Sequence, residues 1–440
     1  MASSSYEREG FEKFYRKELM RIFKFGGASV KDAQGVKNLL RVLKHEGFEN
    51  TLVVVSAMGK MTNAFEKLVY SYLYETTKLT TTIDTIKKYH ETILIDLFEK
   101  DHEVYQEVNR IFARLHDFLN TNTSFDYDFV YDQIVPNGEL ISTKIVHHYL
   151  QINKVANKWL DIRTILKTDS IYRNATVNWE STSNNCKKLD QNQLYITQGF
   201  IGRDSKRNTT TLGREGSDFT AGILAYCLDA ESVTIWKDVE GVLNADPRVF
   251  DATILLEQIS YQEAIEMAFY GASVIHPKTI KPLENKKIPL FVRSFELLET
   301  KGTVVSKGVS LLPKTSCFIV KKQQVLVSIS AKDFSFMIEE NLSHIFNLLH
   351  QDRLKVNLIQ NSAISFSVCL EDNHSNFNHF YDELHPDFEV KYNENVTLYT
   401  VRHFTKEAVS QIEKRGVVLL KQTSRDTIQL VVDEKNNYAN

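Results

Sequence analysis

Short apolar runs alternate with helical patterns through the first two thirds of the chain. IFKF at 22–25 and LVVVSA at 52–57 have the length and composition of buried strands, and between them the apolar residues of 36–43 recur with helical spacing. Further strands are expected at LYITQGFIG (194–202), SVTIWKD (232–238) and IPLFVRS (288–294). Such alternation is typical of βαβ units, so the pattern predicts an α/β domain with a mainly parallel, doubly wound sheet.

Helical patterns fill the spaces between these strands. Apolar spacing predicts two consecutive helices at 81–100 and 101–119, which we interpret as a lid or cap, and further helices that begin at Ser217 and near Ser260. From Glu296 to Ser316 the pattern loosens into small, charged and turn residues, which predicts a domain boundary.

The pattern after this boundary is different. Two successive β-α-β-β units are expected, one from QQVLVSIS to AISFSVCLE (323–371) and one from NVTLYTVR to TIQLVVDE (395–434). They suggest a paired region that senses small molecules, although a coincidence of α+β packing would give the same pattern. The predicted organisation is an N-terminal extension at 1–19, a catalytic domain at 20–305 and a tandem region at 306–440, divided into about 318–385 and 386–440.

Composition narrows the class of protein. Lys and Arg number 53 against 56 Asp and Glu, so the net charge of -3 gives no broad footprint for nucleic acid or an anionic membrane. The four cysteines are far apart and form no zinc or disulfide pattern, which fits a reducing cytoplasm. The apolar runs are too short to span a bilayer, and 1–19 lacks the apolar core of a signal peptide; this segment is either an extension or a plain N-terminal helix.

Three glycine-containing loops follow predicted strands: KFGGAS (24–29), VSAMGKMTN (55–63) and LGREGSD (212–218). Because the carboxyl ends of parallel strands share one edge of a sheet, these loops are expected to converge on one ligand. Gly26 and Gly27 would let backbone N–H groups approach phosphate oxygens, with the charge of Lys24 beside them. Taken alone, KFGG is better explained as a plain glycine turn, and the chain contains neither a P-loop nor a Rossmann glycine motif.

The loop LGREGSD opens a predicted helix, with Ser217 as its expected N-cap and Asp218 in its first turn. Capping leaves Arg214 unexplained. Its planar guanidinium suits a substrate carboxylate, although an arginine on a surface loop is the plain alternative.

Three further motifs carry candidate residues. NGELIST (137–143) places Glu139 in a first helical turn, where it caps the helix or accepts bonds from an amino group. IWKDVEGVLNADPR (235–248) runs from a strand into a charged loop, which is either solvated or suited to a nucleotide. In GASVIHPKT (271–279), His276 has no metal-ligand spacing and is expected to be structural.

Taken together and in this order, these motifs resemble the aspartate kinases of the amino-acid kinase family. The resemblance covers residues 21 to about 305, with two ACT-like units after it, and the wording WKDVEGVL is nearest to the plant-type, single-function branch. It implies an αβα sandwich of the amino-acid kinase fold followed by two ferredoxin-type ACT units, a homodimer joined through those units, and lysine or threonine as an allosteric effector.

The resemblance also implies ATP with Mg2+ as phosphoryl donor and L-aspartate as acceptor. Lys24 would balance charge on the transferring phosphoryl group, and Asp218 would organise Lys24. Arg214 would bind the substrate carboxylate and Glu139 the amino group, with Ser56 and Thr62 lining the pocket. The implied nucleotide side is formed by Gly26, Gly27, Lys237, Asp238, Leu243, Arg248, Ser273 and Val274.

The sequence departs from the common wording of the family at several of these motifs. Ala28 stands where threonine is common, Glu215 where glycine is usual, and Ser273 where many members have lysine, a loss for which Lys237 would compensate. In the tandem region Asn357 replaces a common aspartate, which weakens the case for a bound lysine.

Two alternatives remain open from sequence. One is another amino-acid kinase that phosphorylates glutamate or N-acetylglutamate, against which NGELIST and the ACT pair argue. The other is a catalytically dead amino-acid sensor, which Glu215 leaves open although Lys24, Glu139, Arg214 and Asp218 are intact.

Overall fold

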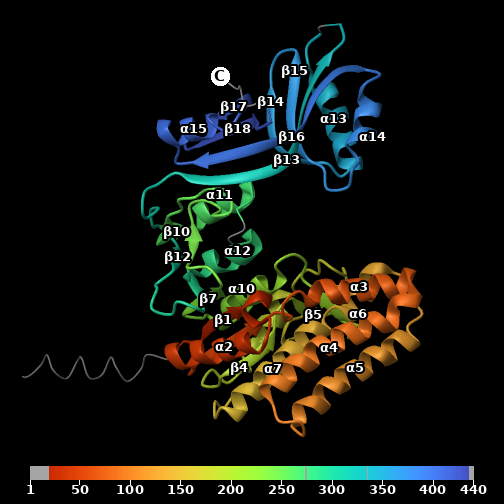
Figure 1. The fold of residues 1–440 in the computed structure, drawn as a ribbon, viewed down its shortest axis with the longest axis vertical. Helices are drawn as coiled ribbons and strands as arrows, with labels where there is room; N and C mark the ends of the chain where they lie inside the picture. The colour runs from red at the N-terminus through yellow and green to blue at the C-terminus, as the bar shows by residue number, and fades with distance from the viewer. Residues whose placement is uncertain (1–18, 273–274, 334, 436–440) are drawn as a thin grey trace, which may run out of the picture. The chain divides into compact units, whose positions relative to one another are not determined.

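The computed structural model describes residues 19–272, 275–333 and 335–435, and these form two compact units (Figure 1). The first unit runs to Val242 and also contains Leu255–Ala264 and Ile275–Ser310, and the second takes the remaining described residues. The expected N-terminal extension lies outside the described residues except for Leu19. The domain limits expected near 305 and 385 stay predictions.

The first unit is built on an eight-stranded sheet in the order β10-β12-β11-β7-β1-β2-β4-β3. Its strands are β1 (Arg21–Phe25), β2 (Thr51–Val55), β3 (Lys158–Leu160), β4 (Tyr195–Gln198), β7 (Ser232–Lys237), β10 (Gln258–Ser260), β11 (Leu290–Ser294) and β12 (Thr303–Ser306). Neighbouring strands are parallel except for β11 and β12. Every residue of β2 is buried, as expected of a strand with both faces covered. The predicted mainly parallel sheet is confirmed.

Helices connect these strands. They are α2 (Ala33–Glu46), α3 (Met61–Tyr74), α4 (Leu79–Leu97), α5 (Glu103–Thr121), α6 (Tyr127–Ile134), α7 (Asn137–Ile152), α8 (Ile162–Ile165), α9 (Trp179–Cys186), α10 (Gly216–Leu228), α11 (Tyr261–Tyr270) and α12 (Pro277–Lys286), with the 3-10 turns η1 (Gly27–Val30) and η2 (Thr76–Lys78). The two consecutive helices expected at 81–100 and 101–119 are α4 and α5. No helix among the described residues is long and apolar enough to cross a membrane.

The single strand expected at LYITQGFIG is wrong. The chain leaves the sheet after β4, and Ile201–Arg203 (β5) pairs instead with Thr209–Thr211 (β6) in a small antiparallel ribbon. The break lies at Gly199, where an added Cβ would stand 2.5 Å from the Ser217 side chain. This close approach brings the strand end against the start of α10, which a local apolar pattern does not reveal.

The second unit contains a six-stranded antiparallel sheet in the order β14-β15-β13-β16-β18-β17. Its elements are β13 (Cys317–Ala331), α13 (Glu339–Gln351), β14 (Lys355–Asn361), β15 (Ser365–Glu371), α14 (Phe377–Leu384), β16 (Phe388–Arg402), α15 (Lys406–Glu413), β17 (Val417–Thr423) and β18 (Thr427–Asp433). The predicted strands and helices are present, together with α14, which was not expected. The central strands β13 and β16 are longer than expected and pair with each other, so the two β-α-β-β halves share one sheet.

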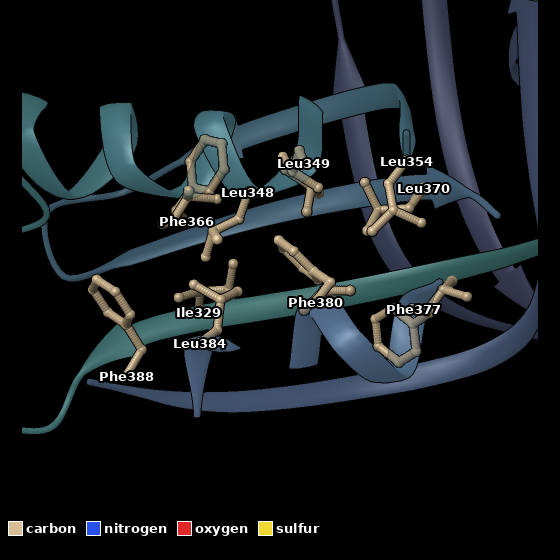
Figure 2. Close-up of a cluster of buried hydrophobic side chains, with 14 of the residues drawn as sticks. Ile329, Leu348, Leu349, Leu354, Phe366, Leu370, Phe377, Phe380, Leu384 and Phe388 are labelled. Atoms are coloured by element: carbon tan, nitrogen blue, oxygen red, sulfur yellow. The ribbon is translucent and has the colours of Figure 1, made fainter. Parts of the chain in front are cut away.

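Two of the hydrophobic clusters on this sheet contain residues from outside its strands. In the first, residues of α13 and α14 pack on the strands, with Phe380 and Phe366 among the buried side chains (Figure 2). In the second, Ala245 and Phe250 pack with Tyr399, Val401 and Ile428. The segment Leu243–Ile254 therefore belongs to the second unit, although its sequence continues the motif that begins on β7. A short pair of β8 (Val242–Leu243) and β9 (Leu255–Leu256) flanks the segment.

Candidate active site

A cavity of about 510 Å³ in the first unit receives residues from all three predicted loops. Eight of the expected site residues line it: Lys24, Gly27, Ser56, Thr62, Glu139, Arg214, Asp218 and Lys237. They come from the carboxyl ends of β1, β2 and β7 and the turns that follow them, from the first turns of α3, α7 and α10, and from the loop before α10. The three loops converge as expected, although the loop at 212–218 follows β6 of the antiparallel ribbon rather than a strand of the parallel sheet.

An ion pair links the central strand to the start of α10. Lys24 Nζ lies 2.5 Å from Asp218 Oδ1, and the two side chains are 11% and 6% exposed. Asp218 occupies the first turn of α10, where the positive end of the helix dipole stabilises a carboxylate. The ammonium group of Lys24 is thus held by a fixed acid at the wall of the cavity.

Gly27 allows the first two loops to meet. Its carbonyl oxygen accepts a hydrogen bond from Gly59 N, in the loop after β2, at 2.9 Å. A Cβ on Gly27 would stand 2.7 Å from Gly59 O and 2.8 Å from Ala57 O. A side chain at this position would force the two loops apart, so glycine is required by the close approach of the backbones.

Glu139 is the most deeply buried acid of the cavity. It lies in the first turn of α7, is 2% exposed, and its Oε1 accepts a hydrogen bond from Ala57 N at 3.2 Å. Its Oε2 has no hydrogen-bond partner among the described residues. Burial raises the pKa of Glu139 to about 8. A cationic group bound in the cavity would satisfy this oxygen and favour the ionised form.

The start of α10 differs from the prediction. The helix begins at Gly216 rather than after Ser217, and Glu215 precedes it with φ 53, in the left-handed region. Ser217 is buried inside the first turn, so its expected role as N-cap is wrong. Gly216 packs against Phe200, whose Cδ2 would stand 2.7 Å from an added Cβ, and this tight packing explains the shifted start.

Arg214 and Glu215 lie exposed beside one another at the cavity. Arg214 forms no ion pair within the described part of the chain, so its guanidinium is free to take an anion. Glu215 adopts a backbone conformation that costs an L-residue about 1 kcal/mol or more and costs glycine very little. The unusual acid at this position therefore carries backbone strain as well as a negative charge.

This strain gives a prediction for stability. We expect the Glu215→Gly variant to be more stable than Glu215→Ala by about 1 kcal/mol, because both remove the charge and glycine alone removes the left-handed strain. Chemical denaturation followed by fluorescence and by circular dichroism measures the difference. Equal stability of the two variants would contradict a strained Glu215.

Sequence reasoning missed Arg173 and Tyr131, which also line the cavity. Arg173 has φ 63, and its backbone N donates to the buried Asp132 Oδ2 at 3.0 Å. Its guanidinium stands 4.6 Å from the ring centre of Tyr131 and 3.2 Å from Asp128 Oδ1. No spacing rule connects this irregular loop with α6, so the sequence carried no signal for it.

Only some of the expected nucleotide-binding residues lie at the cavity. Lys237 lines the cavity at the end of β7, Gly26 lies beside Lys24, and Asp238 is exposed without lining the cavity. Leu243 and Arg248 belong to the second unit.

The remaining expected residues lie away from the cavity or outside the described residues. In the second unit, Arg248 forms an ion pair with Asp246 at 2.7 Å. Ser273 and Val274 lie outside the described residues. His276 caps α12, its Nδ1 accepting from Lys278 N at 3.2 Å, as a structural residue would. Within the described ranges no group of three or more acids, histidines or cysteines could hold a metal ion.

Comparisons with known proteins agree with this arrangement. The model of the amino acid kinase family matches residues 20–294. Lysine-sensitive aspartokinase 3 of Escherichia coli (strain K12) is 30% identical over 357 residues, covering 80% of this chain and 78% of the relative. The chloroplastic bifunctional aspartokinase/homoserine dehydrogenase of Daucus carota is 28% identical over 381 residues; the match covers 80% of this chain and 40% of that longer relative.

Solved structures give the same result over most of the chain. The crystal structure of E. coli aspartokinase III in complex with lysine and aspartate in the T-state has a TM-score of 0.81 and 27% identity, covering 95% of this chain and 97% of that chain. The R-state complex of the same enzyme with aspartate and ADP has a TM-score of 0.77 and 27% identity, covering 94% and 96%. This chain belongs to the amino acid kinase family, and within it to the aspartokinases.

Proposed function

We propose that this protein transfers the γ-phosphoryl group of ATP to the β-carboxylate of L-aspartate and forms 4-phospho-L-aspartate, the first step toward lysine, threonine and methionine. The observation that carries the proposal is the buried Lys24–Asp218 ion pair, which opens on the same cavity as Arg214 and Glu139. The three side chains match the charged groups of the reactants. Lys24 suits the phosphoryl group, Arg214 suits a carboxylate, and Glu139 suits an amino group.

In this proposal the protein holds aspartate by its α-carboxylate and its ammonium group. Arg214 takes the α-carboxylate through its planar fork, Glu139 takes the ammonium group on its unpartnered Oε2, and Ser56 and Thr62 line the space for the side chain. This leaves the β-carboxylate near Lys24. Two fixed contacts at one end of a short substrate define the position of the other end.

The chemistry needs no general base. A β-carboxylate oxygen forms a bond to the γ-phosphorus, the bond from that phosphorus to the β,γ-bridging oxygen breaks, and ADP leaves with the electron pair. The acceptor is already an anion, so catalysis depends on position and on the charge of Lys24. Mg2+ enters with ATP, and Lys237, Asp238, Leu243, Arg248, Ser273, Val274, Gly26 and Gly27 stay the proposed nucleotide side.

Regulation by an end-product amino acid is part of the proposal. The E. coli structure with bound lysine supports lysine as the effector. We propose that the effector acts through the second unit, and that the protein is a cytoplasmic homodimer. Here Asn357 accepts a hydrogen bond from Lys321 Nζ at 2.7 Å and donates to Gln324 Oε1 at 2.7 Å. These bonds engage Asn357 with the chain's own side chains rather than with an effector. Both lysine and threonine are therefore tested as inhibitors.

The raised pKa of Glu139 predicts a pH dependence of substrate binding. Below about pH 8 the empty site holds Glu139 protonated, and its proton must leave before the carboxylate can pair with the substrate ammonium. We expect the KM for aspartate to fall by about tenfold from pH 6 to 7 and by about fivefold from pH 7 to 8, where the slope flattens at the pKa of Glu139. Initial rates across this range measure the slope, with the KM for ATP as internal control. A KM for aspartate that is independent of pH in this range, or a slope that survives in Glu139→Gln, would contradict the assignment.

The reaction class is tested by trapping the acyl phosphate with hydroxylamine. Purified protein is incubated with Mg-ATP and either aspartate, glutamate or N-acetylglutamate, and the hydroxamates are quantified. We expect product from aspartate and a decrease of its rate when lysine or threonine is added. Product from glutamate or N-acetylglutamate instead would assign another amino-acid kinase, and no product from any acceptor would indicate a sensor.

A further inference from the structure

A second cavity, of about 210 Å³, lies in the first unit between α5, α7 and the segment that follows β3. Four cationic side chains border it: Arg110 and Arg114 of α5, Lys144 of α7 and Arg163 of α8. It shares no lining residue with the candidate active site. The excess of positive charge makes it an unusual feature for a chain whose net charge is -3.

The two acids of this cavity are already paired. Lys144 Nζ lies 2.8 Å from Glu107 Oε2, and the Arg163 guanidinium binds both carboxylate oxygens of Asp161 at 2.9 and 2.8 Å. Arg110 forms no ion pair among the described residues, and neither does Arg114, although both face the same hollow. Two positive charges therefore remain without compensation.

Arg110 and Arg114 are four residues apart and lie on one face of α5. Like charges at this spacing repel each other and destabilise a helix. A bound anion between them would remove the repulsion, and each planar guanidinium can hold two oxygens of one phosphate. The pair thus has the geometry of an anion clamp, which a helix surface does not need for stability.

The opposite wall is rigid and partly apolar. Lys144 Nζ stands 3.8 Å from the ring centre of Trp159, and the Trp159 indole N–H donates to the buried Thr143 hydroxyl at 3.0 Å. Leu140 of α7 belongs to this wall, and Ile111 of α5 adds apolar surface beside the arginines. Fixed donors beside apolar surface strengthen attraction to an anion, because less water screens the charges.

We propose that this cavity binds a compact dianion of the phosphate class, held by the forks of Arg110 and Arg114. Its volume suits inorganic phosphate or a small phosphomonoester and falls below the range of pockets for larger ligands. The site is separate from the ATP-binding site that the proposed function requires, and it does not depend on that function.

The test measures how fast each arginine is chemically modified. Intact protein is treated with phenylglyoxal, which modifies arginines, in the presence of sodium phosphate, glycerol 3-phosphate or sodium chloride at equal ionic strength, and modified peptides are quantified by mass spectrometry. We expect phosphate, and the phosphomonoester, to slow modification of Arg110 and Arg114 by about fivefold or more relative to chloride. The exposed Arg425 serves as reference and should react equally in all three. Equal rates for Arg110 and Arg114 in phosphate and chloride would overturn the proposal.

A variant separates a joint clamp from two independent side chains. In Arg110→Gln we expect phosphate to lose most of its protection of Arg114, because one of the two forks is gone. The matched control is Lys37→Gln, which removes one exposed positive charge from another helix of the same unit and should leave the protection unchanged. Full protection of Arg114 in Arg110→Gln would contradict a shared site. Both residues are exposed, so neither variant disturbs the core.

Discussion

Replacing Lys24 by alanine is expected to lower kcat by at least about 10²–10³-fold, the usual loss when a group that stabilises transition-state charge is removed. Lys24 lies at the carboxyl end of the central strand β1, and its ammonium is held by Asp218 at the cavity wall. The KM values for aspartate and ATP should change much less, because Lys24 is expected to act on charge that develops during transfer.

This variant needs a companion, since it leaves Asp218 buried without its partner. Removing one member of a buried ion pair costs about 3–5 kcal/mol, so Lys24→Ala alone could lose activity by unfolding. The double variant Lys24→Ala/Asp218→Asn removes both charges and should keep the thermal transition of the wild type while remaining inactive. Turnover near the wild-type level in a folded Lys24 variant would exclude Lys24 from the reaction.

Replacing Arg214 by alanine is expected to raise the KM for aspartate by roughly 10- to 100-fold, because a hydrogen bond to a charged group contributes about 1.5–3 kcal/mol. Arg214 is exposed at the cavity and has no ion pair among the described residues, so the fold should be unaffected. Steady-state kinetics with aspartate and ATP varied separately measure the two KM values.

Two comparisons sharpen this prediction. Arg214→Lys should recover only part of the affinity, because an ammonium group cannot hold both oxygens of a carboxylate. The exposed Arg207, which is not part of the cavity, provides the matched control as Arg207→Ala. A change confined to the KM for ATP would place Arg214 on the nucleotide rather than on the amino acid.

The sequence was most informative where a side chain follows a regular element. Lys24 was expected near the phosphates because it ends a buried strand, and the parallel strands β1 and β2 bring their loops to one edge of the sheet. The pairing of Asp218 with Lys24 was implied by the family resemblance, and Asp218 itself was expected to open a helix. The same reasoning placed Glu139 in the first turn of α7. Strand ends and helix starts have sequence signals of their own, so their meeting point could be predicted.

The parts that sequence reasoning missed depend on contacts between distant segments. Glu215 adopts a left-handed conformation, and α10 starts one residue early at Gly216, which packs on the distant Phe200. The motif after β7 divides because Phe250 finds its apolar partners in the second unit. Arg173 reaches the cavity through an irregular loop held by Asp132. None of these contacts leaves a periodic pattern in the chain.

The central claim is that the phosphoryl group lands on the β-carboxylate of aspartate, and reduction of the trapped product tests it most directly. Protein, Mg-ATP and aspartate are incubated, the acyl phosphate is reduced with borohydride, and the amino alcohol is identified by mass spectrometry and chromatography. Our account predicts homoserine, since only the β-acyl phosphate gives this alcohol, and predicts that it disappears in the folded Lys24→Ala/Asp218→Asn variant. The isomeric 3-amino-4-hydroxybutanoate would show transfer to the α-carboxylate, with Arg214 and Lys24 on the wrong ends of the substrate, and the absence of any reduced product would contradict the kinase assignment itself.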